Sequence, residues 1–353
     1  MDFNKDLNLV VLSHKNFLHK LYGDLGVLED LLNSFDVKTP FRMDLEADKV
    51  ARILENSDNV ISEKKRKKKR QLEDEVICKE VNFLRQMLDK STQFLEQHFT
   101  GSPTPAEIRD NNKHVRLAVK DYLDKLSNCE CPPSGENTTE MCLVKDDIVY
   151  PPRSAFINVD ISRFSDINEE DPFDIILMDP PWVNKHIKRT NFGGYNMVEN
   201  NVLENICLKE KLSDNGLVFV WCTNSPTHRQ TVRKMFSRWG VTEVAVWFWL
   251  KMTVHGEPVC DFSHSKQPYE VCIVGQKGKC SFTIPDQLVI CSVPSAIHSH
   301  KPPLNDLIEH VLNEENSPVQ WSRLRKLELF GRNLSSGWKT VGNQPCLFNI
   351  LKY

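Results

Sequence analysis

The sequence of 353 residues lacks any run of about 18 apolar residues, the length that a membrane-spanning helix needs. We therefore expect no membrane span. The first 16 residues, MDFNKDLNLVVLSHKN, also lack a basic stretch followed by an apolar run and a cleavage site, so they do not predict a secretory signal. Both absences favour an intracellular protein, in which most of the 11 cysteines would be reduced core residues.

A zinc-binding pattern is also missing. Cys129, Cys131 and Cys142 lie close together in the sequence, but no fourth ligand follows at zinc-finger spacing. A surface loop with spare thiols is the favoured interpretation, and we expect no metal site.

The net charge of −3 excludes a globally basic nucleic-acid binder, because the positive charge is concentrated in one segment. Lys64–Arg70, KKRKKKR, consists of seven consecutive cations. The segment is interpreted as a solvated charge run, a nuclear import signal or a phosphate-binding arm, and these alternatives are compatible. We favour a nuclear location, with the cytosol as the alternative.

The hydrophobic pattern divides the chain into three parts. Residues 1–125 show apolar residues at three- and four-residue spacing, which predicts a mainly helical N-terminal region containing the basic segment 64–70. Residues 126–149 are predicted as a turn-rich linker. Residues 150–353 alternate apolar strands with helices. The expected strands are FDIILM, GLVFVWCT, VAVWFWL, YEVCIVG, QLVICSV and LELFG, and the expected helices are 198–212, 227–239 and 304–314.

Nearly continuous apolar strands that alternate with helices predict an α/β domain with a mostly parallel sheet covered on both faces. Ligands of such sheets bind at the carboxyl ends of the strands. One expected strand, FDIILM, ends directly in Asp179, Pro180, Pro181 and Trp182. The two prolines stop the strand because proline cannot donate to a sheet ladder.

The DPPW turn presents hydrogen-bond acceptors beside a flat aromatic ring. The Asp179 carboxylate and the proline carbonyls suit a planar ligand that carries an amine, such as adenine with its N6 amino group. The N6 lone pair is delocalised into the ring and is a poor nucleophile. Acceptors that hold both N–H hydrogens would orient this lone pair and stabilise the positive charge that develops during methyl transfer. A target base would have to leave its stack to reach such a pocket. A purely structural turn with Trp182 in the core is the alternative.

DPPW after an apolar strand resembles the catalytic motif of the eukaryotic adenine-N6 methyltransferase family. Asp160-Ile161, the segment HSHKPP at 298–303, and LELFGRN followed by VGNQ at 327–344 resemble further motifs of this family in the same order. The similarity covers residues 150–344. It implies a Rossmann-like class I methyltransferase fold with permuted motif order and S-adenosylmethionine as cofactor. A permuted order also agrees with the absence of GxGxxG at the start of the α/β region.

The resemblance also implies roles for individual residues. Asp179 would accept from N6, Pro180 and Pro181 would supply carbonyls, and Trp182 would stack on the adenine or form a wall beside it. Asp160 and Ile161 would contact the cofactor's adenine, and Lys301 its methionine carboxylate or the acceptors of the site. Arg332, Asn333, Asn343 and Gln344 would hold its ribose or adenine. The family's messenger-RNA enzymes have Arg-Pro-His-Asn where this chain has Arg332-Asn333-Leu334-Ser335, so Asn333 is the expected substitute.

Glu328 is expected to be structural because it lies inside a strand, and His298 and His300 are expected to be structural or hydrogen-bonding.

The residues around the motif indicate where a nucleic acid would bind. Lys185, His186, Lys188 and Arg189 follow DPPW closely and suggest phosphate contacts, with a solvated loop as the alternative. The further expected substrate contacts are Tyr195, Lys266, Tyr269 and Glu270.

The favoured function is methylation of adenine N6 in RNA. The resemblance implies adenosine or 2′-O-methyladenosine of small nuclear RNA (U2 type) as the substrate. The alternatives are a DNA adenine-N6 methyltransferase, because the loop cations would neutralise either backbone, and a catalytically inert nucleic-acid-binding scaffold. An intact DPPW with Lys301 disfavours the scaffold. We expect the protein to act as a monomer.

Overall fold

The computed structural model describes residues 1–22, 29–41, 63–167, 171–182, 200–262, 267–279, 283–297, 300–313 and 320–351. Among these residues, no helix combines the length and the apolar character that crossing a membrane requires. The expected contacts at Lys185, His186, Lys188, Arg189, Tyr195 and Lys266, and the expected role of His298, lie outside the described residues.

An eleven-stranded mixed sheet organises the described part of the chain, in the order β1-β2-β11-β9-β10-β8-β7-β12-β13-β6-β3. Its strands are β1 Asp2–Asn4, β2 Leu9–Val11, β3 Ser134–Asn137, β6 Ser154–Asn158, β7 Phe173–Met178, β8 Leu212–Cys222, β9 Val241–Lys251, β10 Tyr269–Lys277, β11 Val289–Ser292, β12 Lys326–Leu329 and β13 Trp338–Gly342. Six neighbouring pairs are parallel and four are antiparallel. The predicted α/β fold with a mostly parallel sheet is confirmed.

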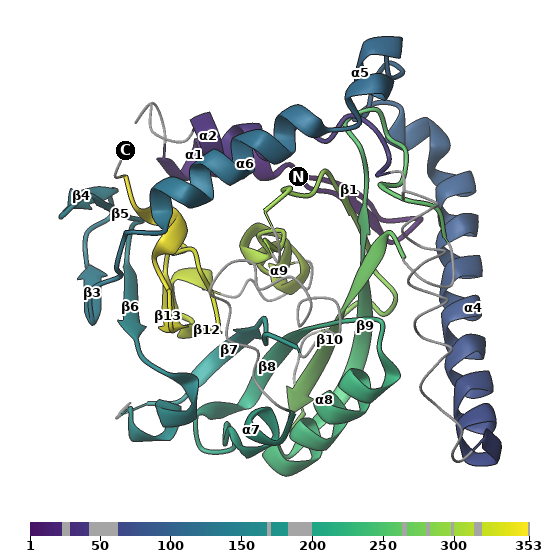
Figure 1. Ribbon diagram of the computed structural model, residues 1–353. Helices are drawn as coiled ribbons and strands as arrows, with labels where there is room; N and C mark the ends of the chain where they lie inside the picture. The colour runs from purple at the N-terminus through teal and green to yellow at the C-terminus, as the bar shows by residue number, and fades with distance from the viewer. Residues whose placement is uncertain are drawn as a thin grey trace.

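Helices cover both faces of this sheet. They are α1 His14–Tyr22, α2 Glu29–Asn33, α4 Glu63–Leu95, α5 Pro105–Asp110, α6 Lys113–Leu126, α7 Asn200–Asn205, α8 Pro226–Trp239 and α9 Asn305–Asn313, with short 3₁₀ turns η1 Ile161–Asp166, η3 Trp321–Arg323 and η4 Leu347–Asn349. The sheet bends around α9, while α4, α7 and α8 lie on its outer side (Figure 1). Alternate residues of β7 enter the two cores: Ile176 packs with α8, and Ile175 packs with α9.

A third core joins the start of the chain to its end. Leu18 and Tyr22 of α1 pack with Tyr122 of α6 and with Phe348 of η4. This core also contains β5 Ile148–Tyr150, which forms a separate hairpin with β4 Leu143–Lys145. The N-terminal helix is therefore part of the same packed body as the end of the α/β region.

Three features of the fold differ from the expectation based on the sequence. The helix predicted for 198–212 is shorter: α7 ends at Asn205, and Leu212 belongs to β8, where it pairs with Phe173 of β7. The segment 126–149, predicted as a linker, contains β3 and β4, and β3 pairs with β6 at the sheet edge. The N-terminal region supplies β1 and β2 at the opposite edge. The division into domains stays a prediction.

Candidate active site

Four neighbouring parallel strands have their carboxyl ends on the same side of the sheet, here called the carboxyl edge. Each of them is followed by a predicted motif. The order in space is β7, β12, β13 and β6, with Met178 opposite Leu329 and Gly342 opposite Asn158. Asp179 follows β7, Arg332 and Asn333 follow β12, Asn343 and Gln344 follow β13, and Asp160 follows β6. Because β10 runs antiparallel to β8, its first residues, Tyr269 and Glu270, lie at the same edge. The fold therefore gathers motifs that are far apart in the sequence.

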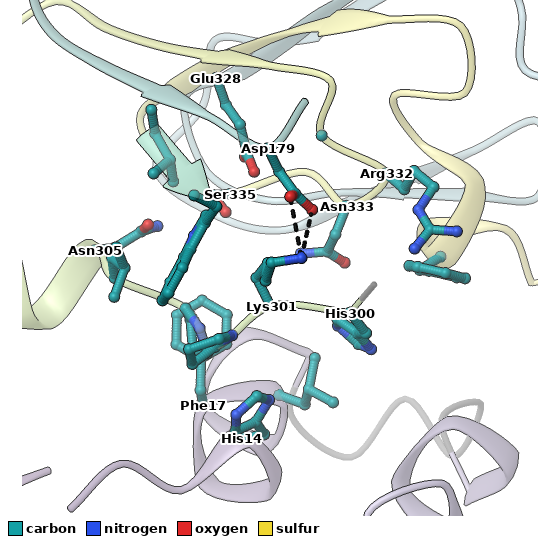
Figure 2. A pocket seen from close by; sticks show the side chains of 18 of the residues that line it. His14, Phe17, Asp179, His300, Lys301, Asn305, Glu328, Arg332, Asn333 and Ser335 are labelled. Atoms are coloured by element: carbon teal, nitrogen blue, oxygen red, sulfur yellow. Dashed lines mark hydrogen bonds and ion pairs between the residues drawn. The ribbon is translucent and has the colours of Figure 1, made fainter. Parts of the chain in front are cut away.

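Lys301 links two carboxylates at this edge. Its Nζ lies 3.0 Å from Oδ1 and 3.2 Å from Oδ2 of Asp179, and 3.3 Å from Oε2 of Glu270 (Figure 2 shows the Asp179 contacts). Glu270 also accepts a hydrogen bond from Lys251. Lys301 therefore contacts the acceptors of the site, and its predicted contact with the methionine carboxylate of the cofactor stays a prediction.

The pKa values of the two carboxyls are shifted in opposite directions. Burial raises the pKa of Asp179 above its usual value, although Lys301 opposes the rise. Burial would raise the pKa of Glu270 as well, but Lys251 and Lys301 together outweigh it and hold that pKa at about 2. Glu270 therefore remains the anion that neutralises the lysines. Asp179 is the carboxyl whose charged form is destabilised by burial.

Glu328 belongs to the site, contrary to the structural role predicted for it. Leu327 and Leu329 point to the outer core, so Glu328 points to the α9 side, where it lines the same cavity as Asp179 (Figure 2). Gly331 makes room for it, because a Cβ there would lie 2.8 Å from the Glu328 carboxyl carbon. Burial, reinforced by the Asp179 charge, raises the pKa of Glu328 to about 8. At neutral pH Glu328 is a neutral acid that can donate a hydrogen bond.

A cavity of about 70 Å³ lies beside these groups. On one side its wall contains Asp179, Glu328, Arg332 and Asn333 from the sheet edge; on the other, α1 and the following chain contribute residues that sequence reasoning missed (Figure 2). These are His14, Phe17, Leu18 and Phe35.

The prolines and tryptophan of DPPW are buried. The Pro180 carbonyl accepts a hydrogen bond from the Trp182 amide at 2.8 Å, which tightens the turn. The Trp182 ring, 7% exposed, stacks on His228 at a centroid distance of 4.8 Å, and its Nε1 donates to the Trp221 carbonyl at 2.9 Å. Trp182 thus packs as the structural alternative predicted, and its stacking on a target base stays a prediction.

The residues predicted to hold the cofactor divide into a group that follows β6 and β13 and a group that lines the cavity. Asp160, Asn343 and Gln344 are exposed, whereas Ile161 is buried. Asp160 caps η1 by accepting from the Ser162 amide at 2.8 Å.

Arg332 and Asn333 line the cavity beside Asp179. The Arg332 guanidinium lies 5.0 Å from the centre of the Phe348 ring. Asn333 Oδ1 accepts from the Tyr22 hydroxyl of α1 at 3.1 Å. The cofactor contacts predicted for both groups stay predictions.

Tyr269 is not placed to contact a substrate. Its ring is 1% exposed and its hydroxyl donates to Glu80 of α4 at 2.8 Å. The expectation of a substrate contact is therefore corrected: α4 covers this residue, whereas its neighbour Glu270 reaches the site.

Residues 173–344 match the MT-A70 family model. They form an MT-A70 domain. The family has the class I methyltransferase fold, and its methyltransferases depend on S-adenosylmethionine. The resemblance predicted from the residues is thereby confirmed.

The names of similar proteins mention both RNA and DNA. The chain is 33% identical over 230 residues to the N(6)-adenine-specific methyltransferase METTL4 of Homo sapiens, covering 61% of this chain and 47% of that protein. It is 35% identical over 203 residues to a DNA N6-methyl methyltransferase of Caenorhabditis elegans, covering 56% and 53%. It is 31% identical over 247 residues to the N6-methyladenosine RNA methyltransferase MTA1 of Pyricularia oryzae, covering 65% and 62%. The chain spans about half the length of the first two relatives.

Glu328→Gln is expected to reduce the loss of stability at alkaline pH. The folded-state pKa of about 8 lies above the ordinary value of 4.5, so the folded protein binds the extra proton and stability falls as pH rises from 4.5 through 8. Glutamine imitates the neutral acid and cannot ionise. Thermal unfolding midpoints at pH 6 and pH 9 should therefore differ less in the variant than in the unmodified protein. Glu140→Gln, at a side chain 75% exposed, is the control. Equal pH dependence in all three proteins would contradict the assignment.

Proposed function

We propose that this protein transfers a methyl group from S-adenosylmethionine to N6 of adenine in RNA. The observation that carries the proposal is the position of Asp179. It lies at the carboxyl end of β7 and is held by Lys301. On one side are exposed residues that are predicted to bind the cofactor, and on the other is the cavity of about 70 Å³. Burying the charged pair of Asp179 and Lys301 costs free energy of desolvation, and an inert scaffold would not need such a pair at this position.

The residues present fit S-adenosylmethionine. The exposed edge formed by Asp160, Asn343 and Gln344 offers polar groups for the adenosine half. The cavity offers Arg332 and Asn333 for a small polar group. The ring nitrogens Nδ1 of His14 and of His300, which have no hydrogen-bond partner within the described part of the chain, belong to residues of the same lining. When bound, the cofactor supplies an electrophilic methyl on sulfonium.

The residues of the chain would act on the target base. Asp179 would accept from one N6 hydrogen, and a carbonyl of Pro180 or Pro181 would accept from the other. The Pro180 carbonyl keeps a second lone pair besides the one that accepts from the Trp182 amide. Both acceptors would orient the nitrogen lone pair and stabilise the charge that develops on it. Lys301 would hold the Asp179 side chain in place. Burial, which raises the Asp179 pKa, also makes it a better proton acceptor once N6 has become cationic.

The choice of RNA, and of adenosine or 2′-O-methyladenosine in small nuclear RNA, rests on the family resemblance. DNA is the second candidate, and the C. elegans relative named as a DNA methyltransferase favours it. A nuclear location and action as a monomer remain part of the proposal. The backbone of the basic segment Lys64–Arg70 is helical within α4, but its side chains lie outside the described part of the structure.

Methyl transfer from labelled S-adenosylmethionine tests the proposal. Matched RNA and DNA oligonucleotides would be offered, with the RNA adenosine carrying or lacking a 2′-O-methyl group. We expect label in N6 of RNA, and the ratio between the two RNAs identifies the preferred nucleotide. Label in DNA alone would move the assignment to the second candidate. Bound cofactor without transfer to any substrate would favour the scaffold.

A further inference from the structure

Cys131 and Cys346 are far apart in the sequence, but the sheet brings them together. Cys131 precedes β3, and its carbonyl accepts a hydrogen bond from Asn158 Nδ2 at 2.7 Å. Asn158 is the last residue of β6 and lies opposite Gly342, the last residue of β13. Cys346 belongs to the turn that follows Gly342. Both cysteines therefore lie beside the ends of β6 and β13, where Cys346 is part of the third core and Cys131 packs against that core.

The sulfur of Cys131 meets two donors of Cys346. It accepts hydrogen bonds from the Cys346 thiol and from the Cys346 backbone N–H. The bond from the thiol is the main cause that lowers the pKa of Cys131, although burial opposes it. The same bond, reinforced by burial, raises the pKa of the Cys346 thiol. Cys131 is therefore the member of the pair that ionises first, and Cys346 stabilises its thiolate.

The two cysteines also differ in access from solvent. Cys131 is half-buried, whereas Cys346 is fully buried. Because the thiolate is the nucleophile of a cysteine, the accessible sulfur is also the more reactive one. Cys129, two residues earlier, has its S–H directed to the Lys125 carbonyl, with Sγ at 3.7 Å from the oxygen. This arrangement, a reactive thiol with a second thiol in contact behind it, is typical of cysteines that are oxidised reversibly.

We propose that Cys131 and Cys346 are a redox-responsive pair that closes to a disulfide when a peroxide oxidises Cys131. The Cys131 thiolate attacks one oxygen of hydrogen peroxide, the O–O bond breaks, and hydroxide leaves with the proton that the thiol had released, as water. Cys131 is then a sulfenic acid. The Cys346 sulfur attacks the Cys131 sulfur, the S–O bond breaks, and the hydroxide leaves with the Cys346 proton as a second water. The two thiols are oxidised, and one peroxide is reduced.

The bond would fix the turn after β13 to the segment that leads into β3. Asn343 and Gln344, which are predicted to hold the cofactor, lie in the chain between Gly342 and Cys346. The pair would thereby connect oxidation of the protein to the carboxyl edge of the sheet. The inference does not depend on the proposed function, because the chemistry needs only the two thiols and a peroxide.

Oxidation of the folded full chain with hydrogen peroxide, followed by alkylation of the remaining thiols and peptide mass spectrometry, tests the pair. The unmodified protein should give a crosslinked peptide that contains Cys131 and Cys346 and that dithiothreitol separates. Cys346→Ser should stop at the sulfenic acid of Cys131, which dimedone traps. Cys131→Ser should remove the crosslink and leave Cys346 reacting at least about tenfold more slowly than Cys131 does in the unmodified protein. Cys129→Ser is the matched control and should form the same crosslink.

Each other outcome would overturn the inference. A crosslink through Cys129 in place of Cys131 would assign the wrong partner. Sulfinic acid at Cys131, with Cys346 still a free thiol, would show that the second thiol does not react with the first. Failure of Cys131 to react at a peroxide concentration that oxidises the exposed Cys78 would show that Cys131 is not activated. The peptide map of the unmodified protein decides between these outcomes even if Cys346→Ser does not fold.

Discussion

Asp179→Asn is expected to lower kcat for methyl transfer by roughly 10²- to 10³-fold, the usual effect of removing one preorganised group that stabilises developing charge. Asparagine has nearly the same size, but its amide nitrogen is a donor, and its oxygen carries no charge to balance a cationic N6. Lys301 would keep Glu270 as a partner at 3.3 Å, so the local fold should survive. The loss should therefore appear in kcat rather than in the unfolding temperature.

The measurement compares initial rates at saturating cofactor and oligonucleotide. Asp174→Asn provides a matched control, because Asp174 lies on the same strand, near its other end, where Oδ2 accepts from the Arg325 amide at 2.9 Å. The control should keep its rate. A rate for Asp179→Asn within tenfold of the unmodified protein would remove Asp179 from the chemistry.

The site could be predicted from the sequence at those positions where an apolar strand is followed directly by polar residues or prolines. DPPW interrupts an apolar run, and LELFGRN places polar residues directly after a strand. Because the carboxyl ends of parallel strands meet at one edge, these motifs had to come together once the sheet was predicted. The structure places Asp179, Arg332, Asn343 and Asp160 after four neighbouring strands of that edge.

Glu328 could not be assigned in this way, because a strand pattern does not reveal which face carries the site. Its side chain alternates with two buried leucines, and only the packing of the sheet shows that its own face meets Asp179. The contribution of α1 was hidden for a related reason. Tyr22 and Asn333 are 311 residues apart in the chain, and no local pattern predicts that they form a hydrogen bond.

The error at Tyr269 has the same origin. In the sequence, an aromatic residue next to Glu270 is a reasonable candidate for a substrate contact. Glu80, 189 residues earlier, accepts the tyrosine hydroxyl and covers it with α4. Short strands such as β2 and β13, of three and five residues, were also missed, because periodicity needs a longer window to distinguish them from loops.

The contact of Glu80 with the α/β region leads to the second large prediction: Glu80→Ala should destabilise the fold by about 3–5 kcal/mol. Glu80 of α4 forms a two-pronged ion pair with Arg229 of α8, with Nη2 at 2.8 Å from Oε2. The two side chains are only 12% and 8% exposed. Removing the carboxylate leaves the Arg229 charge buried without its partner and deprives the Tyr269 hydroxyl of its acceptor.

Urea unfolding of the full chain measures the effect as a lower midpoint. Glu243→Ala is the matched control, because Glu243 forms the same two-pronged pair with Arg233 of the same helix, whose side chain is 56% exposed. That pair should contribute less than about 1 kcal/mol. The double replacement Glu80→Met with Arg229→Met should recover part of the loss, since no buried charge remains unpaired. Equal midpoints for Glu80→Ala and Glu243→Ala would show that α4 is not held to the α/β domain by this pair, and that apolar contacts of Leu84 and Met87 are sufficient.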